Sequence, residues 1–136
     1  MSVDIEAIRA VPLFAGLRDE QLAALGEKLE VREAHTGEHL SSEGGAGYFF
    51  FVLAQGAAEV TRGGEVLAHF GPGDFFGEGA IFRARRRTAT VTATSDSVLY
   101  AMFGADFAKL ASDIPELHER IEAVLDERLP HDVAST

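Results

Sequence analysis

The sequence predicts a mainly β fold with flanking helices: an antiparallel β jelly roll with N-terminal helices and a C-terminal helical lid. Three observations carry this prediction. Turn residues recur every eight to twelve positions between Glu30 and Met102, residues 48–53 form a continuous apolar run, and helical periodicity is confined to the two ends of the chain. Short strands at such spacing are typical of a sandwich or barrel, and a jelly roll limits exposed sheet edges.

Composition narrows the class of protein. The 136 residues include 46% hydrophobic and 25% charged side chains, as in an ordinary single globular domain. The net charge of −10 argues against general binding to nucleic acid or to an anionic membrane. There is no cysteine, no apolar run of membrane-spanning length and no signal-peptide pattern. These features predict a cytoplasmic protein.

The first 29 residues are predicted to form two helices. Residues 4–10 suit a short helix, which Pro12 ends because a proline disfavours helix at the residue before it. Residues 19–29 carry leucines at helical spacing, with Asp19 as the expected N-terminal cap.

Residues 30–103 are predicted to form the jelly roll. The apolar run 48–53 suits a strand that is buried on both faces. Two glycines, Gly63 and Gly64, separate residues 57–62 from 65–70 and predict a two-residue hairpin. Further strands are expected at 88–94, where threonines alternate with small apolar residues, and at 97–102.

Residues 104–130 return to helical periodicity. A short helix is expected at 105–111 and a longer one at 114–129, followed by a frayed tail over 131–136. One face of the longer helix carries Leu117, Ile121, Val124, Leu125 and Arg128. Packing of this stripe on the jelly roll is the plain interpretation.

The stretch 75–91 carries the chemistry. Gly77 and Gly79 have no Cβ, so a ligand can approach the backbone closely there. Exposed N–H groups of a helical turn favour an anion, and Arg87 could hold the same anion with two parallel hydrogen bonds. Glu78 would repel an anion and needs a donor, such as a sugar hydroxyl. The pattern therefore predicts a ligand with a phosphate joined to a hydroxyl-bearing ring.

This stretch resembles the phosphate-binding cassette of the cyclic nucleotide-binding domain family, the cAMP- or cGMP-binding effector domain of catabolite activator-like proteins. The resemblance rests on Phe76-Gly77-Glu78, an apolar pair, a short loop, and Arg87-Thr88-Ala89-Thr90-Val91. Glu78 and Arg87 stand nine positions apart, a spacing common in the family. The turn glycines match as well, so the resemblance covers roughly residues 10 to 129. Gly79 departs from the family's usual Leu or Ile and removes one core contact.

The resemblance implies a role for each cassette residue. Glu78 would bind the ribose 2′-hydroxyl and Arg87 the cyclic phosphate, while Ala80 and Ala89 would offer backbone N–H groups. The expected ligand-binding residues are Phe76, Gly77, Glu78, Gly79, Ala80, Arg87, Thr88 and Ala89.

Ligand identity stays open between cAMP and cGMP. In the family a Thr in the place of Thr88 can bond the exocyclic amine of guanine, but members with Thr there also bind cAMP. Thr88 could equally be a plain β-former. No other cofactor and no metal is expected.

The resemblance also implies a moving part. The last helix of the family swings in and covers the nucleotide base, and Arg128 and Leu129 stand where a base-capping contact is expected. Nothing in the chain could supply a helix-turn-helix domain, so a stand-alone, non-enzymatic sensor is expected if the sequence is the whole protein. Its protein partner would be a second copy or an unknown effector.

Two alternatives remain. A cupin-type metal enzyme shares the jelly roll, and His35, His39 and His69 are available, but cupins place two histidines one residue apart and His35 and His39 are four apart. The other is a degenerate module that binds no nucleotide and serves in dimerisation or docking. The presence of both Glu78 and Arg87 speaks against it.

Overall fold

The computed structural model describes residues 3–41, 49–77 and 89–128, and the side chains of residues 3–40, 49–77 and 89–123. The helices are α1 (Ile5–Arg9), the 3-10 turn η1 (Pro12–Phe14), α2 (Asp19–Lys28), α4 (Gly104–Asp113) and α5 (Pro115–Arg128). The strands are β1 (Glu30–Ala34), β2 (His39–Ser41), β3 (Phe49–Gln55), β4 (Ala58–Arg62), β5 (Glu65–Phe70), β6 (Phe75–Phe76), β7 (Thr90–Ala93) and β8 (Ser97–Phe103). None of the helices described is long and apolar enough to span a membrane.

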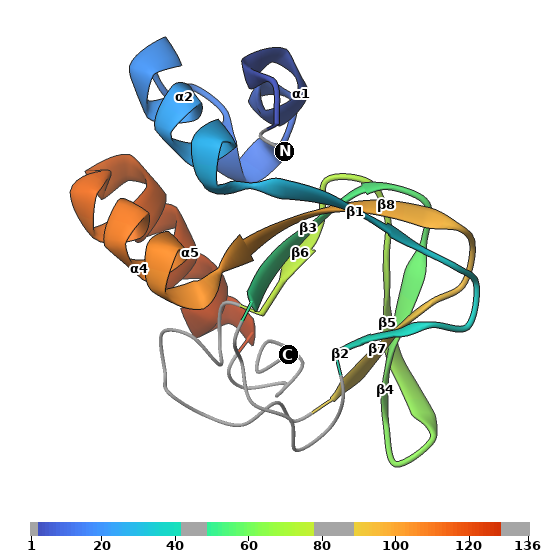
Figure 1. Ribbon diagram of the computed structural model, residues 1–136. Helices are drawn as coiled ribbons and strands as arrows, with labels where there is room; N and C mark the ends of the chain where they lie inside the picture. The colour runs from blue at the N-terminus through green and yellow to red at the C-terminus, as the bar shows by residue number, and fades with distance from the viewer. Residues whose placement is uncertain (1–2, 42–48, 78–88, 129–136) are drawn as a thin grey trace.

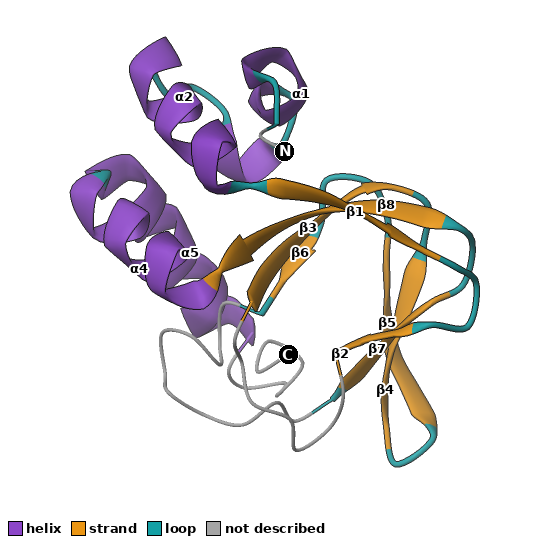
Figure 2. Cartoon of the chain, in the orientation of Figure 1, coloured by secondary structure: helices purple, strands orange, loops and turns teal. Residues whose placement is uncertain are grey.

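The described strands form two antiparallel four-stranded sheets, in the orders β1-β8-β3-β6 and β2-β7-β4-β5. Both sheets are antiparallel throughout. The helices gather beside the first sheet, and the second sheet lies away from them (Figures 1 and 2). The predicted mainly β jelly roll with flanking helices is confirmed.

Strand β3 is buried on both faces, as its apolar run predicts. Phe50 and Val52 belong to one hydrophobic cluster, which they share with the helices. Phe51 and Leu53 belong to a second cluster, which they share with residues of the other sheet. Because side chains alternate along a strand, one run of residues supplies the core on both sides.

The helical cluster is built around aromatic and aliphatic side chains of the two chain ends. Phe50 of β3 stacks on Phe107 of α4 with ring centroids 3.8 Å apart and planes within 7°. Leu117 and Ile121 of α5 are fully buried in the same cluster. The described part of the α5 stripe therefore packs as predicted. The side chains of Val124, Leu125 and Arg128 lie outside the description.

One hydrogen bond joins the last helix to the N-terminal segment. Arg120 of α5 donates from Nη1 to the backbone carbonyl of Leu13 in η1, at 2.9 Å. Gly16 lies beneath this side chain with a φ of +79°, and a Cβ there would stand 3.7 Å from the guanidinium. A hydrogen bond thus joins the last helix α5 to the N-terminal turn η1 beside the first sheet.

The expected elements and the observed ones agree within two residues at each described end. The hairpin at Gly63 and Gly64 is confirmed: β4 pairs with β5 up to Arg62 and Glu65, and both glycines have positive φ. This is the backbone conformation that a type I′ turn requires.

The predicted capping role of Asp19 is wrong. Helix α2 begins at Asp19 itself, with Arg18 as the residue before it. The N–H of Arg18 donates to Oε1 of Gln21 at 2.9 Å. Asp19 instead accepts a hydrogen bond from Nη2 of Arg9 at 2.8 Å. A cation on the neighbouring helix therefore engages the carboxylate that was expected to cap its own helix.

Replacement of Gly56 by alanine should destabilise the fold strongly. Gly56 has a φ of +100°, and a Cβ would lie 2.8 Å from Cα of Ser97. Gly64 has a similar φ of +83° but open space around it. We expect Gly64→Ala to cost about 1–2 kcal/mol, from backbone strain alone. Gly56→Ala should lower the free energy of unfolding, measured by urea denaturation, clearly more than Gly64→Ala does. Equal losses of stability in the two variants would contradict this prediction.

The pH dependence of stability should carry a contribution from Asp96. Hydrogen bonds from the N–H and hydroxyl of Thr36, at 3.0 and 3.3 Å, lower the pKa of this carboxyl below its ordinary value. Its stabilisation is present above the unfolded-state pKa of about 3.9 and is lost as pH falls through the lower folded value. The stability difference between the parent and Asp96→Ala should therefore shrink below about pH 4. A difference that does not change with pH would refute this.

Candidate functional site

The inner face of the first sheet carries a row of aromatic rings. Phe103 packs edge-on against Phe49 with centroids 5.6 Å apart, and Phe49 lies 6.1 Å from Phe51. Phe51 stacks on Phe76 at 5.1 Å, and Phe76 stacks on Phe70 of the other sheet at 5.8 Å. The row therefore runs from the end of β8, across β3, to the residue that opens the cassette motif.

Phe75, Phe76 and Gly77 are the described residues at the start of the cassette stretch. Phe76 is fully buried, and its strand β6 pairs with β3 through Phe51. Gly77 follows at once with a φ of +99°. Only glycine adopts that conformation without strain, so this residue fits the sequence-based reason for a glycine at the start of the motif.

Ala89 is the first described residue in the second half of the motif. It is fully buried in the same hydrophobic cluster as Phe76. Strand β7 begins at the next residue and pairs with β4, with Val91 opposite Val60. The structure thus brings Phe76 and Ala89 onto one core. The other expected ligand-binding residues, Glu78, Gly79, Ala80, Arg87 and Thr88, lie outside the described residues, as does Leu129.

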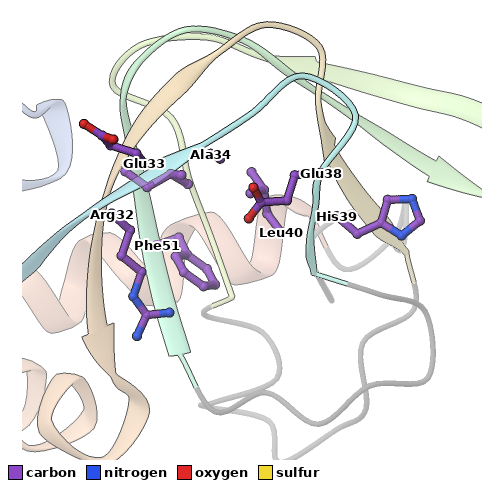
Figure 3. A pocket seen from close by; sticks show the side chains of 8 residues that line it. Arg32, Glu33, Ala34, Glu38, His39, Leu40 and Phe51 are labelled. Atoms are coloured by element: carbon purple, nitrogen blue, oxygen red, sulfur yellow. The ribbon is translucent and has the colours of Figure 1, made fainter.

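A cavity of about 170 Å³ opens between the sheets where β1 and β2 lie at their edges. It is lined by Arg32, Glu33, Ala34, Glu38, His39, Leu40, Phe51 and Leu99 (Figure 3). Its apolar walls are barrel residues, and its polar residues come from β1, from the segment that leads into β2 and from the first residue of β2. Figure 3 shows Arg32 beside Phe51, whereas Glu33 and His39 point away from the cavity.

The cavity and the cassette motif share a wall. Phe51 lines the cavity and also stacks on Phe76, the residue before Gly77. The volume far exceeds the roughly 10–15 Å³ that one water needs. Four of its eight lining residues are polar or charged. The cavity therefore lies next to the start of the motif, but it is smaller than the roughly 300–1,000 Å³ of a typical small-molecule site.

Sequence reasoning missed Arg32 and Phe49. The carbon at the centre of the Arg32 guanidinium lies 4.4 Å from the centroid of the Phe49 ring. Nη2 of Arg32 lies 3.9 Å from Oε2 of Glu30, and the two side chains are 41% and 62% exposed. The apolar run that contains Phe49 was visible in the sequence, but nothing in it signalled a cation stacked on that ring.

The three histidines of the metal alternative are not brought together. Nδ1 of His35 lies 3.9 Å from Oδ1 of Asp96, on the surface. His39 is in β2 and His69 is in β5, at opposite edges of the second sheet. Over residues 3–41, 49–77 and 89–123, no group of three or more His, Cys, Asp or Glu side chains could hold a metal ion.

Comparison with known protein families identifies the family of this chain. A family model described as cyclic nucleotide-binding domain matches residues 31–113. The chain belongs to the cyclic nucleotide-binding domain family. The match covers β1 to α4 and both described flanks of the cassette motif.

This cyclic nucleotide-binding domain matches one part of each of several longer curated proteins. A cAMP-dependent protein kinase regulatory subunit of Eremothecium gossypii is 32% identical over 81% of the chain and 24% of its own length. A cGMP-dependent protein kinase of Drosophila melanogaster is 32% identical over 85% of the chain and 16% of its own. A cyclic nucleotide-gated potassium channel of Mesorhizobium japonicum is 33% identical over 84% and 32%. The chain spans between a sixth and a third of these relatives.

Solved structures share the fold. The Thermus thermophilus catabolite activator protein has a TM-score of 0.77 at 31% identity, over 88% of this chain and 59% of that one. A putative cyclic nucleotide-binding protein of Geobacter metallireducens has a TM-score of 0.81 at 22% identity, over 93% and 98%. The regulatory subunit of a cAMP-independent protein kinase A from Trypanosoma brucei reaches 0.83 at 18% identity, over 90% and 44%. At these last two identities the likeness establishes the fold alone.

Filling the cavity should cost less than filling the packed core. Ala34 and Ala101 are both 2% exposed on the inner side of the first sheet, and of the two Ala34 lines the cavity. Overpacking at Ala101→Leu should cost about 1–3 kcal/mol. Ala34→Leu can grow into empty space and should cost less in urea denaturation. Equal losses would show that the cavity has no room for the added methyl groups.

Proposed function

We propose that this chain is a cyclic nucleotide-binding regulatory domain that takes cAMP or cGMP. The phosphate would sit at the cassette, and the sugar and base would face the aromatic inner wall of the barrel. The observation that carries the proposal is the placement of Phe76 and Ala89, the described flanks of the cassette, on one barrel core beside a cavity. It is supported by relatives whose names are those of cAMP- and cGMP-dependent kinases and a cyclic nucleotide-gated channel.

The residue roles follow from charge. Arg87 carries the fork of N–H donors that a cyclic phosphodiester can accept, and the chain is otherwise strongly acidic. Glu78 offers an acceptor to the ribose 2′-hydroxyl. The backbone N–H groups of Ala80 and Ala89 would complete the anion site. Thr88 would face a guanine amine if the ligand is cGMP.

Helix α5 is the proposed moving lid, with Arg128 and Leu129 over the base. A ligand can shift α5 only through different affinities for its two positions. The bond from Arg120 to the Leu13 carbonyl supports a movement that includes η1, since the two would move together or the bond would break. The regulated partner would be a second copy of the chain or an effector protein, and the setting would be the cytoplasm.

A second candidate function is a docking or dimerisation module without a ligand. The solved structure of the regulatory subunit of a cAMP-independent protein kinase A from Trypanosoma brucei has the same fold at a TM-score of 0.83, so this fold does not by itself imply regulation by cAMP. A thermal-shift titration separates the candidates. A ligand at a hundred times its dissociation constant stabilises by about 2.7 kcal/mol. The absence of any shift with either nucleotide would favour the docking module.

Arg87→Ala should weaken cyclic nucleotide binding by at least about thirtyfold. Loss of one partner from a buried, hydrogen-bonded charge pair costs roughly 2–5 kcal/mol, and 2 kcal/mol is about thirtyfold in affinity. Glu78→Ala should weaken binding less, because its partner hydroxyl is neutral. Titration calorimetry with cAMP and cGMP measures both.

Arg85→Ala is the matched control. Arg85 belongs to the same arginine cluster as Arg87, formed by Arg83, Arg85, Arg86 and Arg87, and is not expected to contact the ligand. It should bind within about threefold of the parent. If Arg85→Ala and Arg87→Ala lose equal affinity, the cluster acts only through its general potential and the assigned phosphate contact is wrong.

A further inference from the structure

Strand β1 forms a regular edge of the first sheet. Its five residues pair with β8 in one unbroken register, and on its other side no strand of the described chain pairs with it. Of the other edge strands described, β2 has three residues, β6 has two, and β5 pairs with β4 across a register shift. A free edge is a template for pairing with another chain. Among the described strands, β1 therefore offers the longest regular edge.

The side chains of β1 divide between the two faces of the sheet. Directly opposed residues of an antiparallel pair share a face. Val31 lies opposite Tyr100, which packs against the helical cluster. Glu30 and Arg32 lie opposite residues of the second cluster, on the barrel side. Val31 is 48% exposed although it is apolar. The edge thus presents an exposed valine with an acid on one side and a base on the other.

This order of residues is complementary to itself. When two copies of a strand pair about a two-fold axis, each contact between two different positions occurs twice. Antiparallel pairing centred on Val31 places the two valines opposite each other on the helix side. It also places Glu30 of each copy opposite Arg32 of the other on the barrel side. Centring on Glu30, Arg32 or Glu33 would instead oppose like charges, which is destabilising.

The two charged side chains are within reach of such a pairing. Nη2 of Arg32 lies 3.9 Å from Oε2 of Glu30 in the same strand, beyond hydrogen-bond distance. Those two residues are two positions apart, about 6.6 Å along the strand. Directly opposed residues of paired strands have Cβ atoms only about 4.5–5.5 Å apart. Glu30 of a second copy would therefore start nearer to Arg32 than the Glu30 of its own strand.

We propose that β1 is an association surface for a second copy of this chain, with the two β1 strands paired antiparallel about Val31. The pairing would join the first sheets of the two copies into one continuous sheet. A single pair of short strands makes a small interface, so the dimer is weak and depends on protein concentration. The pairing needs no bound nucleotide, so this proposal goes beyond the proposed function and does not depend on it.

The plain alternative is that the charges of β1 protect the edge. Charged and inward-pointing side chains on an edge strand discourage pairing with other chains. The net charge of −10 also opposes contact between two copies. Protection needs charge but no order of signs, whereas pairing about Val31 needs opposite signs at positions 30 and 32. The two roles therefore differ in what charge reversal does.

The first test is sedimentation velocity over a range of concentrations, on the parent and on three folded variants. Glu30→Arg and Arg32→Glu each oppose like charges twice, so each should weaken self-association at least about fivefold. An equimolar mixture of these two variants opposes unlike charges at both positions and should recover the association of the parent. Glu33→Arg is the matched control, because it makes the same charge change as Glu30→Arg but would face the uncharged Leu29. It should stay within about threefold of the parent.

The second test reports the register by disulfide formation, since the chain has no cysteine. In the proposed pairing the two Val31 residues are directly opposed, with Cα atoms about 4.5–5.5 Å apart, which a disulfide can span. The two Glu33 residues would be displaced by four positions, roughly 13 Å along the strand. Val31→Cys should therefore form disulfide-linked dimers under mild oxidation, and Glu33→Cys should not.

Recovery of association in the mixture, together with cross-linking at position 31 alone, would support the paired edge. A parent that stays monomeric at every concentration would leave β1 as a protected edge and overturn the proposal. Association that both charge reversals leave unchanged, or equal cross-linking of the two cysteine variants, would put the contact on another surface. Nucleotide titration of the parent is a separate measurement: no binding would end the proposed function and leave the paired edge standing.

Discussion

The two-sided burial of the central strand is the constraint on which the rest of the structure depends. Phe50 and Val52 supply the helical side of the core, while Phe51 and Leu53 supply the barrel side. A slip of one residue in the pairing with β8 would exchange these two sets. The stack of Phe50 on Phe107 and the stack of Phe51 on Phe76 would then be lost together. Helix packing and barrel packing are therefore specified by one register.

That register also positions the site. Phe51 is at once a wall of the cavity and the partner of Phe76, so the cavity and the start of the cassette are set by the same ring. Ala89 belongs to the same cluster and fixes the other flank. In the sequence, the charged cassette residues lie between these two described anchors.

Much of the fold could be predicted from local patterns. Glycine pairs specify a tight hairpin and an apolar run specifies two-sided burial, because both depend on adjacent residues only. The cap of α2 was mispredicted because Arg9, ten residues away in sequence, binds Asp19. The position of Arg32 was missed because it is set by Phe49 and Leu99, two residues that are distant in sequence and that the fold brings near. The roles of Glu78 and Arg87 came from the motif alone and remain predictions.

The hydrogen bond from Arg120 to the Leu13 carbonyl joins the last helix to the turn at Pro12–Phe14. Leu117 and Ile121 of the same helix are fully buried in the helical cluster, so this bond adds to apolar packing. A displaced α5 would either carry the turn at Pro12–Phe14 with it or release it altogether. Pro12 in turn lies against Gly73, in the loop that leads into β6, so release at one end of the chain would loosen the support of that loop. Contacts of Leu13 and Pro12 therefore connect the described part of α5 to the loop that precedes the cassette.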